Sequence, residues 1–248
     1  MTEPPILLEG LLSIEAALRS ASRPILTLCV RENHKDYAIA KLIKTAEAAG
    51  IPTFRVPEEE INLQAQGTTH GGVIAFVGER RYTPLELLTR GIKEAWIVML
   101  DGVEDPYNYG QSIRAFYAAG AHGIVTRGRD WSRAAGTVAR ASAGASELMP
   151  TALVENVEDA AAALRNAGLK IVVADKRRAV PMYKADLRGG LFLIIGGEKR
   201  GVTRSFADSA DARVSIPYGR EFDQALGTTA AAAALAFEVL RQRSIKAE

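Results

Sequence analysis

Polar, glycine-bearing turns follow three apolar runs in the second half of the chain. Each turn comes where a predicted strand ends, and together the turns hold the residue types best suited to chemistry. The apolar runs and their turns are 96–101 with 105–110, 191–195 with 196–201, and 214–217 with Gly219. In a parallel α/β sheet the turns after the strands line one edge, which is where ligands bind. The pattern therefore predicts one composite site built from three turns.

The turn at 196–201 comes close to the nucleotide-binding loop G-x-x-x-x-G-K-[ST], which follows a strand and precedes a helix. Val202, however, stands where that loop needs a lysine to contact the phosphates. The dinucleotide-binding pattern G-x-G-x-x-G is also missing. A nucleotide hydrolase is therefore a poor interpretation, and on its own the turn predicts only a solvated glycine loop.

The composition excludes several classes of protein. The chain has 248 residues, 48% hydrophobic and 24% charged, which is enough for one large globular domain or two modest ones. The net charge is only +2, so a surface for nucleic acid has to come from local clusters of basic residues. The single cysteine, Cys29, excludes an internal disulfide framework, and with only three histidines we expect no metal site.

Neither a targeting segment nor a membrane span is expected. Residues 1–5 lack the basic region and long apolar core of a signal peptide. No apolar run approaches the roughly 20 residues that a membrane-spanning helix needs. The expected location is the cytoplasm, without a membrane partner.

Alternating apolar and turn-forming segments predict an α/β protein. Before residue 80 we expect strands at 25–30, 52–56 and 73–77, and helices at 10–20, 35–49 and 57–64. After residue 92 we expect strands at 96–100, 123–126, 151–154, 170–174, 191–195 and 213–216, and helices at 110–120, 131–142, 157–167, 203–208 and 228–243. The polar segment between them predicts two domains, 1–80 and 92–248, joined by a linker at 81–91.

The order and wording of the three turns resemble the three motifs of the SpoU (TrmH-like) branch of the SPOUT RNA methyltransferases. The matching segments are Asp105-Pro-x-Asn108-x-Gly-x-x-x-Arg114, Gly196-Gly-Glu198-x-x-Gly201, and Ile216-Pro-x-Gly followed by Leu226. Residues 141–147 look like the family's helix segment between the first two motifs, and 50–60 with 69–75 are similar to the substrate-binding domain that many members carry. The resemblance spans nearly the whole chain.

This resemblance implies a small α/β RNA-binding domain followed by an α/β domain with a parallel sheet and a C-terminal trefoil knot. Members bind S-adenosylmethionine within the knot, largely through main-chain groups. The positions carried over to this chain are Gly196, Ile216 and Leu226. The implied partners are structured RNA, ribosomal rather than transfer RNA, and a second copy of the chain in a homodimer.

The implied reaction is transfer of the methyl group to a ribose 2′-hydroxyl of RNA. Asn108, Arg114 and Glu198 match the family's catalytic positions. Arg114 is the position that the family associates with removal of the hydroxyl proton, yet a guanidinium holds its own proton too tightly to be a ready base. Two roles for Arg114 stay open, base or anchor of the RNA phosphate, and the anchor is the simpler.

The third motif departs from the family. Members usually read Ser-Leu-Asn before the last helix, where this chain reads Ala225-Leu226-Gly227. Two polar side chains are therefore missing, although Thr228 or Thr229 lies close enough along the chain to compensate. The alternative function is a catalytically weak or inactive RNA-binding protein that keeps the knotted fold.

Basic residues gather in a few places that are candidate contacts for RNA. The clusters are Arg127, Arg129, Arg133 and Arg140; Lys176, Arg177 and Arg178; Lys199 with Arg200; and, in the small domain, Arg31, His34 and Lys35. Any one cluster is equally consistent with ordinary solvated loops. Lys199 and Arg200 are the strongest candidates for a phosphate contact, because they flank the predicted site.

Overall fold

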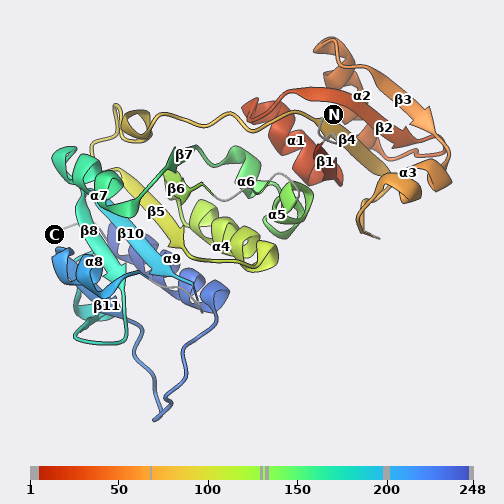
Figure 1. Cartoon of the computed structure of the whole chain (residues 1–248). Helices are drawn as coiled ribbons and strands as arrows, with labels where there is room; N and C mark the ends of the chain where they lie inside the picture. Colours follow the sequence, from red (N-terminus) through yellow and green to blue (C-terminus); the bar gives the residue numbers. More distant parts are fainter. Residues whose placement is uncertain (1–5, 68, 129–130, 132–133, 198–201, 246–248) are drawn as a thin grey trace. The chain divides into compact units, whose positions relative to one another are not determined.

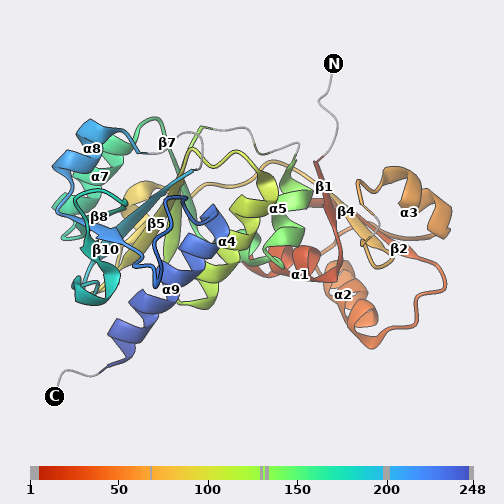
Figure 2. The same ribbon diagram turned by 90° about the horizontal axis from the view of Figure 1, so that it is seen from below.

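The computed structural model describes residues 6–67, 69–128, 131, 134–197 and 202–245, shown in Figures 1 and 2. They form two compact units. The first unit is Met1–Arg81 with Asp130–Leu148, and the second unit is Tyr82–Arg129 with Met149–Glu248. The chain passes from the first unit to the second between Arg81 and Tyr82. The linker predicted at 81–91 begins at this point, and we propose it as the domain boundary. The sequence gives no sign that residues 130–148 pack with the first unit.

The first unit is built on a four-stranded mixed sheet in the order β1-β4-β2-β3. Its strands are β1 (Ile6–Glu9), β2 (Ile25–Arg31), β3 (Thr53–Val56) and β4 (Val73–Val77), and its first helices are α1 (Leu11–Ser20), α2 (Tyr37–Ala48) and α3 (Glu58–Gln64). β4 runs antiparallel to β1 and β2, whereas β2 and β3 are parallel. Strand β1 was not predicted, because its apolar residues run directly into those of α1. Gly10, with φ of +82°, separates the two elements.

Local signals explain where the predicted helices of this unit begin and end. The Asp36 carboxylate caps α2 by accepting a hydrogen bond from the Ala38 N–H at 2.7 Å. Gly50 follows α2 with φ of +72°, the left-handed conformation that a side chain disfavours.

Cys29 lies half-buried in β2, and burial raises the pKa of its thiol, with the charge of Glu60 acting in the same direction.

Two helices from the middle of the chain complete the first unit. They are α5 (Ala135–Ala141) and α6 (Ala145–Leu148). Ala139 of α5 is fully buried in the core formed by Leu8, Ile14 and Val30. Helix α5 corresponds to part of the helix predicted over 131–142. Its place in the core means that the unit is assembled from two separate stretches of sequence.

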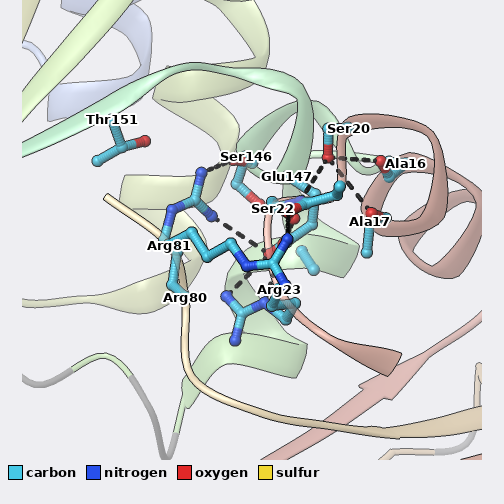
Figure 3. A network of polar contacts seen from close by, with 12 residues as sticks. Ala16, Ala17, Ser20, Ser22, Arg23, Arg80, Arg81, Ser146, Glu147 and Thr151 are labelled. Atoms are coloured by element: carbon cyan, nitrogen blue, oxygen red, sulfur yellow. Dashed lines mark hydrogen bonds and ion pairs between the residues drawn. The ribbon is translucent and has the colours of Figure 1, made fainter. Parts of the chain in front are cut away.

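A buried ionic network fixes α6 in this unit (Figure 3). Glu147 is only 2% exposed and receives two hydrogen bonds from the Arg23 guanidinium, at 3.0 and 3.1 Å. The Ser22 hydroxyl donates at 2.5 Å, and Arg80 lies 3.4 Å away. Burial alone would raise the pKa of Glu147, but the charges of Arg23 and Arg80 outweigh it and hold that pKa below its usual value. The carboxylate is therefore ionised and links both stretches of the unit.

The second unit contains a seven-stranded sheet in the order β7-β6-β5-β10-β8-β11-β9, with every neighbouring pair parallel. Its strands are β5 (Trp96–Asp101), β6 (Gly123–Arg127), β7 (Thr151–Val154), β8 (Lys170–Ala174), β9 (Val180–Pro181), β10 (Leu191–Gly196) and β11 (Ala212–Ser215). The predicted α/β class with a parallel sheet is confirmed. The two-residue strand β9 is too short to leave a sequence pattern.

Helices cover both faces of this sheet. They are α4 (Pro106–Ala118), α7 (Val157–Asn166), α8 (Arg204–Ser209) and α9 (Thr228–Ser244), with the short 3₁₀ helices η1 (Leu85–Leu88) and η3 (Met182–Lys184). Trp96 meets Phe116 of α4 edge to face, with ring centroids 6.1 Å apart, and the Arg243 guanidinium of α9 lies 5.5 Å from the Trp96 ring. Ile97 points the other way, into the core under α7 and α8. Helices α4 and α9 pack side by side (Figure 2).

Parallel pairing brings the carboxyl ends of the strands to one edge of the sheet. Gly196 at the end of β10 is in register with Asp101 at the end of β5. β8 and β11 end at the same edge, and the chain continues from β5 into α4 and from β11 towards α9. The threading of a trefoil knot stays a prediction. No helix in the described part of the chain is long and apolar enough to span a membrane.

Candidate active site

The first and second turns touch through their backbones. The Gly197 N–H donates to the carbonyl oxygen of Asp101 at 2.7 Å. A Cβ atom on Gly197 would lie 2.8 Å from the Val103 nitrogen and closer still to the Gly102 carbonyl. A side chain at 197 is therefore excluded unless the first turn moves. The sequence expectation that these two turns meet is correct in this respect.

The second and third turns, together with the end of β8 and the segment after it, line a cavity of about 320 Å³ at the carboxyl edge of the sheet. Gly196, Ile216 and Leu226, the three positions predicted to hold the cofactor, all line it. Other lining residues are Val173, Ala174, Asp175, Lys176, Arg177, Ile195, Gly197, Val202, Ala207, Val214, Ser215, Tyr218, Ala225, Ala231 and Leu235. Apolar side chains thus form its floor, and polar groups gather on the loops, as in small-molecule sites of this size.

Asn108 lies on the first turn of α4, half-buried. The Asp105 carboxylate caps the helix by accepting a hydrogen bond from the backbone N–H of Asn108 at 2.7 Å. The Thr229 hydroxyl, on the first turn of α9, donates to the Asn108 side-chain oxygen at 3.3 Å. With its oxygen accepting from Thr229, the Asn108 amide has its NH₂ group as a donor, for which the described residues offer no acceptor. Thr229 is thus placed to supply a hydroxyl at the third motif.

Arg114 lies on the same helix, six residues after Asn108 and therefore about 9 Å along the axis. Its side chain is exposed. Six residues carry Arg114 about 120° around the axis from Asn108, so the two side chains leave the helix on different faces. Among the described residues no hydrogen bond or ion pair joins Arg114 to Asn108. Glu198 falls outside the described residues, so its predicted role stays a prediction.

Asp101 is a buried carboxylate beside the site. The sequence analysis did not single it out. It is 3% exposed and forms an ion pair with the Arg127 guanidinium, 2.5 Å away. Burial raises the pKa of Asp101, while the charge of Arg127 opposes that rise. The signal available in the sequence was an aspartate closing an otherwise apolar strand. Its pairing with Arg127 joins the ends of β5 and β6.

The structure shows which of the basic residues predicted as RNA contacts are already paired with carboxylates. Arg127 is paired with Asp101, and Arg140 forms an ion pair with the buried carboxylate of Glu9. In the small domain Arg31 pairs with Glu58 at 2.9 Å, and the acidic start of α3 follows at 58–60. Arg177 and Arg178 are exposed. Arg129, Arg133, Lys199 and Arg200 lie outside the described residues. No group of metal-binding side chains occurs within the part of the chain that is described.

Comparison with known proteins identifies the family. A family model described as the SpoU rRNA Methylase family matches residues 95–236, more than half of the chain. The chain belongs to this family. A second model, described as RNA 2′-O ribose methyltransferase substrate binding, matches residues 7–83. The SpoU resemblance drawn from the three turns is therefore confirmed.

Relatives of known name cover the chain almost completely. A 23S rRNA (guanosine-2′-O-)-methyltransferase, RlmB, from Ralstonia nicotianae is 31% identical over 244 residues, covering 96% of both chains. YacO from Bacillus subtilis, a putative TrmH family tRNA/rRNA methyltransferase, is 30% identical over 90% of this chain and 91% of its own.

Two solved SpoU structures have the same fold. An AdoMet-bound rRNA methyltransferase from Sinorhizobium meliloti matches with a TM-score of 0.79 and 28% identity, covering 95% of this chain and 87% of its own. AviRb from Streptomyces viridochromogenes, solved with AdoMet, matches with a TM-score of 0.80 over 95% of this chain and 89% of its own. At 23% identity, the AviRb match concerns the fold alone.

Proposed function

We propose that this protein is an S-adenosylmethionine-dependent RNA methyltransferase that modifies a ribose 2′-hydroxyl of ribosomal RNA. The observation that carries the proposal is the cavity formed by the second and third SpoU turns, with the first turn packed against it. The substrate-binding family match at residues 7–83 supports RNA as the partner. The RlmB relatives, which are named as 23S rRNA guanosine 2′-O-methyltransferases, favour ribosomal over transfer RNA.

The cavity suits S-adenosylmethionine in size and chemistry. Its floor of Val173, Ile195 and Leu235 offers apolar contact to a flat base, and the glycines at 196 and 197 expose main-chain groups without side chains. We assign cofactor contacts to Gly196, Ile216 and Leu226. The bound cofactor supplies a methyl group on a positively charged sulfur.

The protein's own residues have to position the RNA. The ribose 2′-oxygen bonds to the methyl carbon as the carbon–sulfur bond breaks in line, and the hydroxyl proton passes to water. Placement of the 2′-oxygen is worth several kcal/mol of the barrier. Asn108, held by Thr229, presents its NH₂ group at the start of α4. We assign to Arg114 the role of binding the phosphate next to the target ribose, since a planar guanidinium binds phosphate oxygens through two N–H groups. Glu198 keeps its assignment as the third catalytic residue.

Replacing Thr229 tests whether the hydroxyl compensates for the missing side chains of the third motif. The Thr229→Val variant keeps the shape but removes the donor to Asn108, so we expect kcat to fall about tenfold, the cost of a hydrogen bond of roughly 1.4 kcal/mol. The affinity for S-adenosylmethionine stays the same. Thr229→Ser, which keeps the hydroxyl, restores kcat. Equal turnover of the valine and serine variants would remove Thr229 from the site.

We also propose a homodimer formed through α4 and α9. These helices pack together and expose Tyr117 (38%) and Phe237 (52%), apolar surface that a partner copy would cover. Sedimentation velocity is expected to give twice the chain mass of 26.6 kDa, and the Phe237→Glu variant to sediment as a monomer. A monomeric wild type at micromolar concentration contradicts the dimer.

The binding step is tested by calorimetric titration with S-adenosylmethionine, with ATP as a control. The proposal requires micromolar binding of the former and no binding of ATP. A wild-type protein that binds RNA but neither small molecule would instead be the non-catalytic RNA-binding protein that Ala225 and Gly227 made conceivable. If the protein bound ATP in the presence of magnesium but did not bind S-adenosylmethionine, a nucleotide-binding enzyme would be favoured.

A further inference from the structure

The loop between β11 and α9 forms one wall of the cavity. Residues 216–227 contain neither helix nor strand and leave the body of the second unit as a long loop (Figure 1). Tyr218, Ala225 and Leu226 from this loop line the cavity. A loop of this length without internal structure is costly to order, so something has to fix its path.

Lys176 joins this loop to the opposite wall. It lies just after β8, in the segment that lines the cavity from the other side. Its ammonium group donates to the carbonyl oxygens of Asp223, at 3.1 Å, and Gln224. The same group lies 5.1 Å from the centroid of the Tyr218 ring. One positive charge thus holds two carbonyls and one aromatic ring of the loop.

Tyr218 ties the loop to itself. Its hydroxyl accepts a hydrogen bond from the Leu226 N–H at 3.1 Å and donates to the Gln224 carbonyl at 3.3 Å. On its outer side the ring packs near Phe222, with centroids 6.0 Å apart. The main chain at Leu226 is therefore positioned by a side chain eight residues earlier.

We propose that Lys176 and Tyr218 are positioning residues of the cofactor cavity, which hold the third-motif loop in its path. We call these two residues the clamp. Lys176 connects the loop to the segment after β8, and Tyr218 connects two parts of the loop to each other. Because the loop is ordered in advance, S-adenosylmethionine does not have to order it on binding. This inference rests on the proposed function, since it names the ligand of the same cavity.

Three variants test the clamp. Lys176→Met removes the charge but keeps the length of the side chain, and Tyr218→Phe removes only the hydroxyl. Lys176→Arg keeps donors for the carbonyls and a cation for the ring. The matched control is Arg220→Met, which removes one exposed charge from the same loop at a residue outside the cavity lining.

Two readouts separate positioning from folding. By calorimetry, Lys176→Met and Tyr218→Phe are each expected to weaken S-adenosylmethionine binding about tenfold, or about 1.4 kcal/mol. Lys176→Arg is expected to restore most of the affinity, and Arg220→Met to leave it unchanged, with equal melting temperatures throughout. In hydrogen exchange without ligand, the Leu226 amide is protected in the wild type and exchanges faster in Tyr218→Phe.

The outcomes are distinguishable. Unchanged affinity in both clamp variants, or tighter binding by Tyr218→Phe, overturns the clamp while the proposed function stands. If the wild type binds no S-adenosylmethionine, the proposed function fails. The exchange rate of the Leu226 amide then tests the clamp without a ligand. If Tyr218→Phe leaves this rate unchanged, the clamp is rejected. A faster rate in Tyr218→Phe supports the inference that the clamp orders the loop.

Discussion

The Arg114→Ala variant is expected to lose methyl transfer by about 10²-fold, because the phosphate anchor that places the target ribose for in-line attack is gone. The loss follows from the role proposed for Arg114, which lies on the same helix as Asn108. Because the side chain is exposed, the fold should be unaffected. Single-turnover transfer of a labelled methyl group to ribosomal RNA measures the effect, and calorimetry with S-adenosylmethionine should show unchanged binding.

Two further variants make this result specific. Arg114→Lys keeps the charge but not the planar pair of donors, so we expect only partial recovery if Arg114 binds phosphate. Gln111→Ala removes another exposed side chain from the same helix and serves as the matched control. Turnover of Arg114→Ala equal to that of Gln111→Ala would exclude Arg114 from the mechanism.

Replacement of Glu147 by glutamine is expected to destabilise the first unit by about 3–5 kcal/mol, because it leaves the Arg23 charge buried without its carboxylate. Arg23 is only 6% exposed and directs two hydrogen bonds at Glu147. Denaturant unfolding followed by a probe in the first unit measures the loss. The comparison variant is Glu58→Gln, which breaks an exposed ion pair with Arg31 in the same unit and should cost less than about 1 kcal/mol.

The effect of Glu147 should also depend on pH. The pKa of Glu147 is lowered in the folded protein, so its contribution to stability is present above the unfolded pKa of about 4.3 and is lost as the pH falls below it. The difference in stability between wild type and Glu147→Gln should therefore shrink on acidification. Equal losses of unfolding free energy in Glu147→Gln and Glu58→Gln at neutral pH would show that the buried ion pairs stabilise the unit no more than the exposed pair does.

Much of the fold was predictable because it is specified locally. The strands around Trp96 and Leu191 are continuous apolar runs, as expected for strands buried on both faces. Asp36 and Gly50 mark the two ends of α2 by capping chemistry that can be read from residue types alone. The three turns could be placed at one edge because parallel strands all end there.

Other features depend on contacts distant in sequence and leave no local pattern. Nothing near residue 147 reveals that its carboxylate meets Arg23, 124 residues earlier. The link from Lys176 to the carbonyls of Asp223 and Gln224 uses main-chain atoms, which no residue type announces. The sequence could name Thr228 or Thr229 as compensating for Ala225 and Gly227, but the bond from Thr229 to Asn108, 121 residues earlier, could not be read from it.

The most direct test of the account is transfer of tritiated methyl groups from S-adenosylmethionine to unmodified ribosomal RNA, followed by alkaline hydrolysis. A methylated 2′-oxygen cannot attack the neighbouring phosphate, so the label should appear in dinucleotides that resist alkali. Label released in mononucleotides would place the methyl group on a base and contradict the assignment. No transfer by a protein that binds both S-adenosylmethionine and the RNA would contradict the proposed catalysis itself.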